Sequence, residues 1–303
     1  MTDYIAIPDD AALGQQSHLR QKVVTRFAPS PNGNLHIGHA MAAICAHDFA
    51  RKHGGRFLLR IEDIDGIRSR TEYRQAIIDD LHWLGLSWDG GVIYQSTRVP
   101  QYQAALNRLR EMGLVYRCNC SRSDIAAAIK LRPVAHGPDG PVYPATCRGK
   151  FIPDDVSTSW RLNMKAALEH VSEPLFWHDL ASGEQAADPA IFGDVILWRK
   201  DAPASYHLAA TLDDAADGIS HVVRGRDLFA YTAVHILLQK LLGLLQPVYW
   251  HHQLFVDQNG EKLSKSRGSS ALADLRQAGA DGKKVANDLR RGKLPLGISL
   301  TTD

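Results

Sequence analysis

Two segments far apart in the sequence carry side chains suited to binding phosphate. The first, residues 29–39, contains His36 and His39, which lie three positions apart and so share one face of a helix. Their rings can therefore bind the same phosphates, and Gly38 leaves room for a flat ligand. The N–H groups and the dipole of a helix N-terminus favour a phosphate at the same place. Taken alone, the two histidines fit an ordinary helix equally well.

The second segment is Glu261-Lys-Leu-Ser-Lys-Ser266, which lies among glycines and serines after a predicted strand. Lys262 and Lys265 on such a loop can close over a triphosphate and stabilise the charge that develops at the α-phosphate. By itself a segment of this kind is most often a solvated basic loop. The two segments together point to a nucleotide.

Three cysteines form a candidate metal site. Cys118, Cys120 and Cys147 offer soft thiolates that suit tetrahedral zinc, and a structural zinc normally has four ligands. His136 is the conventional type of fourth ligand, although it lies in a stretch rich in proline and glycine. The alternative is a set of buried, reduced cysteines without metal. Cys45, on an amphipathic helix, is predicted to be a core residue.

The first phosphate-binding segment lies where a predicted strand joins a predicted helix. Residues 22–27 are typical of a buried strand, residues 35–53 repeat their apolar side chains at helical spacing, and residues 56–61 form a second strand. Strand, loop, helix and strand in succession predict a βαβ unit of a parallel sheet, with a ligand at the carboxyl end of the first strand.

The rest of the chain predicts an α/β fold that an insertion divides. Cysteine, proline and glycine become frequent after Tyr116, and short strands follow before the helix and strand pattern resumes. The predicted helices are residues 72–84, 101–112, 206–215 and 227–245, and the later strands are 159–163, 195–199, 221–224 and 248–256. The expected parts are an N-terminal extension (1–21), the first half of the catalytic domain (22–115), the insertion (116–200), the second half (201–257), and a Lys/Ser loop with a short helical tail (258–303).

Composition supports a folded, cytoplasmic protein. The 303 residues include 45% hydrophobic and 22% charged residues and carry a net charge of +2, which excludes disordered, collagen-like and coiled-coil chains. No stretch offers the roughly 20 apolar residues of a membrane span, and the N-terminus lacks the apolar segment of a signal peptide. We therefore expect no membrane association and reduced or metal-bound thiols.

The two phosphate-binding segments resemble the two signatures of class I aminoacyl-tRNA synthetases, which have a Rossmann-like catalytic domain with a connecting insertion. Residues 26–33, 60–65, 206–209 and 221–226 resemble the glutamate-specific branch of that family, and the resemblance extends from about residue 23 to residue 267. It implies that ATP, with Mg²⁺, and L-glutamate form glutamyl-adenylate, whose acyl group passes to RNA.

The resemblance also implies the roles of individual residues. Arg26 and Arg224 can bind the two carboxylates of glutamate, and Glu62 can pair with its ammonium group. Spacing does not decide which arginine binds the side-chain carboxylate, and we choose Arg224. The predicted glutamate site comprises Arg26, Phe27, Ala28, Pro29, Ser30, Glu62, Tyr206 and Arg224. The predicted ATP site comprises His36, Gly38, His39, Lys262 and Lys265, of which His36, His39 and Lys265 are expected to be catalytic. Asp63 and Asp65 could bind Mg²⁺ and are left unassigned.

Residues 118–147, here called the cysteine segment, are similar to the zinc site of glutamyl-Q tRNA(Asp) synthetases, which are short relatives of glutamyl-tRNA synthetases. That similarity implies one structural zinc held by Cys118, Cys120, Tyr143 and Cys147. Only 37 residues follow Ser266, whereas an anticodon-binding domain needs of order 100, so none is expected.

The implied reaction is transfer of glutamate to queuosine at the wobble position of tRNA(Asp). Two alternatives remain open. One is a minimal glutamyl-tRNA synthetase that charges the tRNA 3′ end. The other is a catalytically silent, zinc-containing RNA-binding paralogue.

Overall fold

The computed structural model describes residues 7–8, 22–257, 260–261, 263, 271–294 and 298–301. Its α-helices are α1 (Ile37–Lys52), α2 (Thr71–Trp83), α3 (Val99–Glu111), α4 (Arg122–Leu131), α5 (Met164–Val171), α6 (Tyr206–Ala216), α7 (Thr232–Leu242), α8 (Leu272–Gln277) and α9 (Gly282–Arg290). Short 3₁₀ helices are η2 (Gln95–Arg98), η3 (Pro189–Phe192) and η4 (Arg226–Leu228).

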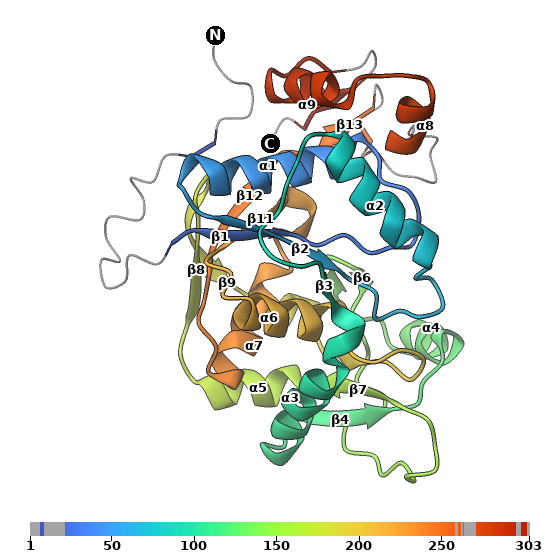
Figure 1. The fold of residues 1–303 in the computed structure, drawn as a ribbon. Coiled ribbons are helices and arrows are strands. Elements are labelled where there is room, and N and C mark those ends of the chain that lie inside the picture. The colour runs from blue at the N-terminus through green and yellow to red at the C-terminus, as the bar shows by residue number, and fades with distance from the viewer. Residues whose placement is uncertain are drawn as a thin grey trace.

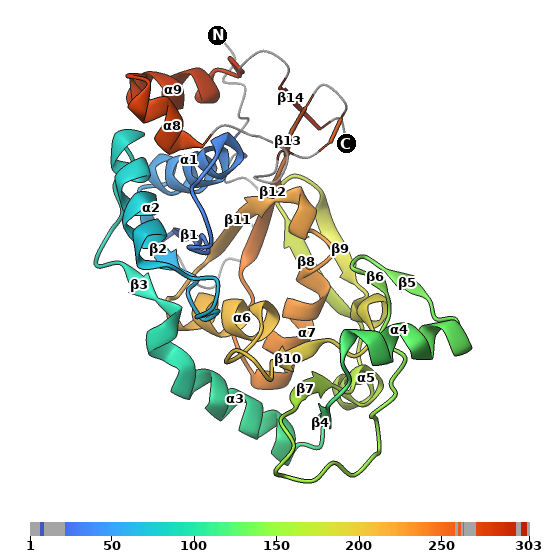
Figure 2. The same cartoon turned by 90° about the vertical axis from the view of Figure 1, so that its right-hand side faces the viewer.

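The strands of the two halves of the fold are β1 (Val24–Phe27), β2 (Arg56–Ile61), β3 (Ile93–Tyr94), β11 (His221–Gly225) and β12 (Val248–His252). Strands β4 (Val115–Cys118), β5 (His136–Gly137), β6 (Gly140–Pro141), β7 (Ser159–Leu162), β8 (Leu175–Asp179), β9 (Gly183–Ala187) and β10 (Ile196–Trp198) come between them, and β13 (Phe255–Val256) and β14 (Ser299–Leu300) follow. Figure 1 shows their arrangement, and Figure 2 shows the same fold turned by 90°.

The predicted βαβ unit is present. Strands β1 and β2 pair in parallel, with Val24 opposite Arg56, and α1 connects them. The helix begins two residues later than its apolar pattern suggested, because the His36 side chain accepts a hydrogen bond from the Gly38 N–H and caps the helix there.

The two halves of the chain meet along β1 and β11. The Ser220 N–H donates to the Val24 carbonyl (3.1 Å), which places β11 beside β1, and β11 pairs in parallel with β12. Strand β8 extends this sheet in parallel beyond β12, and only β9 runs antiparallel to its neighbour. The predicted α/β class with a mostly parallel sheet is confirmed.

The strands of residues 116–200 belong to three sheets, one of which is the small hairpin of β5 and β6. Strands β4, β7 and β10 form a separate antiparallel sheet, whereas β8 and β9 join β12. The pairing of β8 depends on contacts with residues about 70 positions later, such as Tyr249 opposite Asp179, so no local pattern could reveal it.

The sheets β1–β2–β3 and β11–β12–β8–β9 lie side by side and are together called the central sheet. Both faces of the central sheet are apolar, as expected for parallel strands. Along β2, Phe57, Leu59 and Ile61 face one core, and Leu58 faces the other. Figure 1 shows α1 and α2 on one side of the sheet and α6 and α7 on the other. The C-terminal helices α8 and α9 pack beside α2 and α1, where Arg290 pairs with Asp48 (2.6 Å).

The expected long strand at residues 248–256 is two strands. Strand β12 stays in the central sheet, and β13 leaves it to pair with β14 near the C-terminus. Cys45 lies in the core with no exposed surface, as predicted. Within the described residues, no helix has the length and apolar character that crossing a membrane requires.

Candidate active site

A cavity of about 1290 Å³ opens beside the carboxyl ends of β1 and β11. The eleven predicted glutamate-site and ATP-site residues that the structure describes all line it: Arg26, Phe27, Ala28, Pro29, Ser30, His36, Gly38, His39, Glu62, Tyr206 and Arg224. Lys262 and Lys265 lie outside the described residues. The structure therefore brings together side chains that lie almost 200 positions apart, and their chemical roles stay predictions.

The two histidines at the start of α1 have a defined tautomer. Nδ1 of His36 accepts from the Gly38 N–H, and Nδ1 of His39 accepts from the His36 N–H, both at 3.1 Å. A backbone N–H can only donate, so the neutral rings carry their protons on Nε2. The rings lie 3.9 Å apart, and a Cβ at Gly38 would come within 2.9 Å of His36. Each ring can thus donate from Nε2 to a phosphate.

The guanidinium of Arg224 is held on all of its edges. Only 6% of this residue is exposed, and each of its five N–H donors has a protein acceptor. The acceptors are His251 Nε2 (3.0 Å), Tyr206 Oη (3.3 Å), His235 Nδ1 (3.3 Å), the Leu228 carbonyl (3.1 Å) and Thr232 Oγ1 (2.6 Å). The two Nη1 bonds are the longest, so Nη1 is the atom that a ligand carboxylate can approach at the lowest cost.

A buried carboxylate orients the histidine that holds Arg224. Nδ1 of His251 donates to Oδ2 of Asp179 (2.7 Å), and both side chains are fully buried. Burial lowers the pKa of His251 to about 4, although Asp179 acts to raise it. The ring is therefore neutral at pH 7, with its proton on Nδ1, and Nε2 is free to accept from Arg224.

Arg26 belongs to a buried network of charges that joins the two halves of the fold. Its Nε and Nη2 donate to the two carboxylate oxygens of Asp214 (2.9 and 3.2 Å). The fully buried Arg60 donates to Asp214 (2.8 Å) and Asp217 (3.1 Å). Burial raises the pKa of Asp214, but the two arginines lower it below its ordinary value. Asp214 therefore fixes the plane of the Arg26 guanidinium.

Glu62 lies at the edge of this network. Its Oε1 is 3.7 Å from Nη2 of Arg60, and its backbone N–H donates to the Pro29 carbonyl. Burial raises the pKa of Glu62 to about 7, although Arg60 and Arg26 lower it. A cationic ligand beside this carboxylate would favour its ionised form.

Several cavity residues had no counterpart in the sequence analysis. Arg68, Tyr231 and His252 line the cavity, and His235 and Asp179 support Arg224 from behind. One sequence signal for the buried network was available. Arg60 is a charged residue within a mostly apolar strand, which indicates a buried charge that needs partners. Asp63 and Asp65, left unassigned above, accept from protein groups: Asp63 from Ser96 and Arg74, and Asp65 from Arg68 and Arg199.

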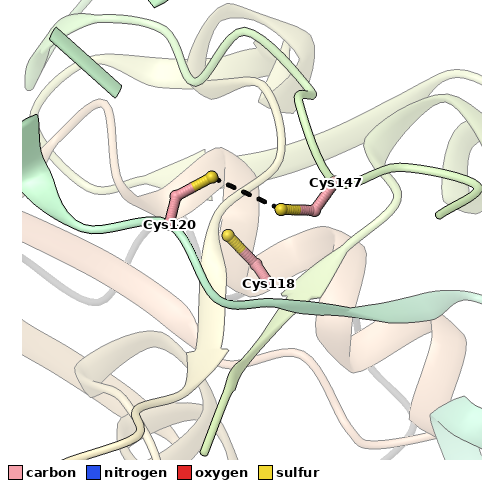
Figure 3. Close-up of side chains that lie close together, drawn as sticks. All are labelled: Cys118, Cys120 and Cys147. Carbon is pink, nitrogen blue, oxygen red and sulfur yellow. Dashed lines mark hydrogen bonds between the residues drawn. The ribbon is translucent and has the colours of Figure 1, made fainter. Parts of the chain in front are cut away.

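The three cysteines of the candidate metal site converge (Figure 3). Their sulfur atoms all lie within 4.8 Å of one another, and Cys120 Sγ is 3.3 Å from Cys147 Sγ. Tyr143 Oη lies 3.3 Å from Cys118 Sγ and 3.5 Å from Cys120 Sγ. In tetrahedral zinc coordination, neighbouring sulfurs are about 3.8 Å apart. The four groups can close on one ion with small adjustments, whereas His136 is exposed and outside the group.

Comparison with known proteins identifies the family. Residues 22–296 match the family described as tRNA synthetases class I (E and Q), catalytic domain. The glutamyl-Q tRNA(Asp) synthetase of Rhodobacter capsulatus is 48% identical over 270 residues, which are 85% of this chain and 96% of that protein. The corresponding enzyme of Symbiobacterium thermophilum is 39% identical over 87% of this chain and 84% of its own length.

Glutamate–tRNA ligases are similar over a smaller part of their length. That of Nitratidesulfovibrio vulgaris strain DP4 is 40% identical over 89% of this chain but 57% of its own. The crystal structure of a glutamate tRNA ligase from Elizabethkingia meningosepticum in complex with its amino acid superposes with a TM-score of 0.68 and 26% identity, over 82% of this chain and 53% of that one. The chain thus spans just over half of those ligases, and it belongs to the class I tRNA synthetase family (E and Q), a family of ligases.

Proposed function

We propose that the chain activates L-glutamate with ATP and transfers the glutamyl group to queuosine in tRNA(Asp), in the cytoplasm. The observation that carries this proposal is a single cavity lined both by two buried arginines with Glu62 and by the histidine pair of α1. A ligand with two carboxylates and an ammonium group matches the first set, and a nucleotide matches the second. The names of two relatives that match this chain over 96% and 84% of their own length support queuosine as the acceptor.

In the activation step, an oxygen of the α-carboxylate of glutamate attacks the α-phosphorus of ATP in line. The bond from that phosphorus to the bridging oxygen breaks, and pyrophosphate leaves with Mg²⁺. The carboxylate is already ionised, so the step needs no general base. His36 and His39 hold phosphate oxygens through Nε2–H, and Lys265, with Lys262, neutralises the charge that develops at the α-phosphate.

The amino acid is oriented by groups on β1, β11 and α6 and in the segments that follow β1 and β2. Arg224, with Tyr206 beside its Nη1, binds the side-chain carboxylate, while Arg26 and the loop through Ser30 lie near the reacting end. Glu62 pairs with the ammonium group. In the transfer step a hydroxyl of the RNA attacks the carbonyl carbon of the adenylate, AMP leaves with the electrons of the broken C–O bond, and the hydroxyl proton passes to the departing phosphate.

We also propose one structural zinc on Cys118, Cys120, Tyr143 and Cys147. The fit rests on the converging thiols and on the Cys147 N–H, which donates to Tyr143 Oη (3.0 Å) and would stabilise that oxygen as an anionic ligand. The ion would supply folding energy to the segment and takes part in no chemical step.

Glutamate-dependent ATP–pyrophosphate exchange without RNA tests the activation step. We expect exchange in the wild type, and Arg224→Lys should raise the KM for glutamate because a single ammonium cannot replace five oriented donors. Arg226→Lys, two residues along the same strand end and not part of the cavity lining, is the matched control and should keep the wild-type KM. No exchange at all would favour the silent RNA-binding paralogue.

Transfer of labelled glutamate to tRNA(Asp), with and without queuosine, tests the acceptor. Nuclease mapping should place the label in the anticodon loop and only on RNA that contains queuosine. Label on the 3′-terminal adenosine, regardless of queuosine, would identify a minimal glutamyl-tRNA synthetase instead.

A further inference from the structure

A second cavity, of about 330 Å³, lies between the cysteine segment and α6. Its lining includes Tyr143, Arg161, Phe192 and His207, with Asp139 and Ile125 also contributing. None of these residues except Tyr143 has a place in the proposed reaction or metal site. The volume is at the lower end of the range for small-molecule sites and suits one planar group.

The wall of this cavity depends on close backbone contacts. The hairpin of β5 and β6 packs on η3 so tightly that a Cβ at Gly137 would lie 2.2 Å from the Ile191 carbonyl oxygen. Gly193 has a φ of +60°, and a Cβ there would lie 2.2 Å from Val142 Cγ1. The stretch rich in proline and glycine, a loop by its composition, thus forms a fixed wall.

Arg161 is a buried cation whose hydrogen-bond donors are only partly used by the described residues. Only 7% of the residue is exposed, and its guanidinium stacks on the Tyr143 ring at 3.7 Å. Within the described part of the chain, the guanidinium of Arg161 makes one hydrogen bond, from Nη1 to the Asp194 carbonyl (2.8 Å), and its Nε–H has no acceptor. The carboxylate of Asp194 pairs with Arg148 instead. A buried guanidinium without a carboxylate partner favours a ligand that brings hydrogen-bond acceptors.

The remaining lining is aromatic and mixed in polarity. Phe192 and His207 are buried rings, 6.2 Å apart and nearly perpendicular, and burial lowers the pKa of His207 to about 4, so the ring is neutral at pH 7. Asp139 adds a carboxylate at the exposed side. Flat surfaces for stacking, guanidinium donors and a carboxylate acceptor are what proteins use to bind an unstacked base of single-stranded RNA.

The second cavity shares a wall with the active-site cavity. Tyr231 lines the active-site cavity, and its hydroxyl donates to Asp139 of the second one. His207 stacks on Tyr231 with ring centres 5.5 Å apart and planes at 24°. The rings of Tyr231 and His207 therefore lie between the two cavities, so a ligand in the second cavity would be a neighbour of one in the active-site cavity.

We propose that the second cavity binds the base of a nucleotide next to the one that accepts glutamate, with Arg161 donating to the acceptors on its edge. The inference rests on the proposed function, because it needs an RNA acceptor. It adds a base-specific contact that holds the opened loop while the neighbouring nucleotide reacts.

The test couples a change in the protein to a change in the RNA. Transfer rates are measured for the wild type and Arg161→Met on queuosine-containing tRNA(Asp) and on the same RNA with an abasic residue on either side of queuosine in turn. We expect Arg161→Met to lower kcat/KM about tenfold or more on intact RNA. On the RNA that lacks the contacted base, the two proteins should transfer at nearly equal rates.

Controls separate this loss from damage to the cysteine segment. Arg148→Met removes a cation that contacts the same aspartate and is absent from the cavity lining, so its effect should be independent of the abasic sites. At Ile125, which is half-buried on α4, tryptophan should fill the cavity and slow transfer, whereas alanine should not. Exchange without RNA should be unchanged in all four variants.

The outcomes distinguish this inference from the proposed function. The second-cavity inference alone would be overturned by two results together. Arg161→Met would lower the transfer rate by the same factor on intact RNA and on each abasic RNA, and Ile125→Trp would transfer glutamate at the wild-type rate. Absence of glutamate transfer by the wild type would overturn the proposed function, and this inference with it.

Discussion

Replacing Asp179 with asparagine would test how the Arg224 guanidinium is held. The Asp179 carboxylate accepts four hydrogen bonds. Its Oδ2 receives Nδ1–H (2.7 Å) and the backbone N–H (3.0 Å) of His251, and Oδ1 receives the N–H groups of Ala181 and Ser182 (3.0 Å each). An asparagine must turn its own NH₂ group toward one of these two pairs of donors.

The two orientations have different costs. An amide turned toward Ala181 and Ser182 leaves two backbone donors without an acceptor, at about 1–3 kcal/mol each. Turned toward His251, the amide leaves the His251 backbone N–H without its acceptor, and it can donate to Nδ1 if the ring moves its proton to Nε2. That proton then faces the Nε–H of Arg224 at 3.0 Å, and the hydrogen bond that orients the guanidinium is lost.

The expected effect on glutamate binding follows from that lost bond. A hydrogen bond to a charged group contributes about 1.5–3 kcal/mol, and about 1.4 kcal/mol corresponds to a factor of ten. We expect Asp179→Asn to raise the KM for glutamate about 10-fold to 100-fold in pyrophosphate exchange. The kcat should change less, because Asp179 touches none of the reacting atoms.

Asp188→Asn is the control, since Asp188 caps a short 3₁₀ helix through the same kind of side-chain bond to a backbone N–H. It should leave the KM for glutamate unchanged. A wild-type KM in Asp179→Asn, with or without a lower Tm, would show that His251 does not orient Arg224 through its tautomer.

Three further predictions concern the charged groups and thiols. With the pKa of Glu62 at about 7, the ionised fraction of its carboxyl group falls about tenfold from pH 8 to pH 6. The KM for glutamate should therefore rise about tenfold as the pH falls over that range, and Glu62→Gln should abolish this dependence. A KM that does not change with pH in the wild type would contradict the pairing of Glu62 with the ammonium group. Metal analysis should find one zinc per wild-type chain and much less in Cys147→Ser, and a metal-free wild type would refute the site. Arg60→Met should lower the free energy of unfolding in urea by about 3–5 kcal/mol, because it removes the fully buried cation that Asp213, Asp214 and Asp217 share and leaves these carboxylates to Arg26 and Arg98, and a loss below about 1 kcal/mol would show that the network is neutral.

The parts of the fold with strong local patterns could be predicted from the sequence. The mostly apolar segment 56–61 and the helical spacing of residues 35–53 predicted the βαβ unit to within two residues at each end. Because the segment predicted to bind phosphate follows the first strand directly, the pattern also predicted which strand end borders the cavity. The resemblance to a known family then supplied the distant strand ends that complete it.

The supports of the site could not be predicted, because they depend on pairing between distant segments. Asp179 reaches His251 only because β8 adds to β12, and a single sequence does not show which strands are neighbours. Helix α4 was missed for another reason: its start is marked by Ser121 and Asp124, which cap it reciprocally, and that signal lay in a stretch dominated by cysteine, proline and glycine.

The buried Arg60 network has a consequence for synthesis of the chain on the ribosome. Arg60 lies in the second strand of the sheet, and its partners Asp214 and Asp217 are made 154 and 157 residues later. Until α6 has left the ribosomal tunnel, the first half could close its core only by burying the Arg60 cation without the carboxylates of Asp214 and Asp217. The nascent N-terminal half should therefore remain open to chaperones and proteases through the synthesis of the whole cysteine segment, and folding should complete in one late step.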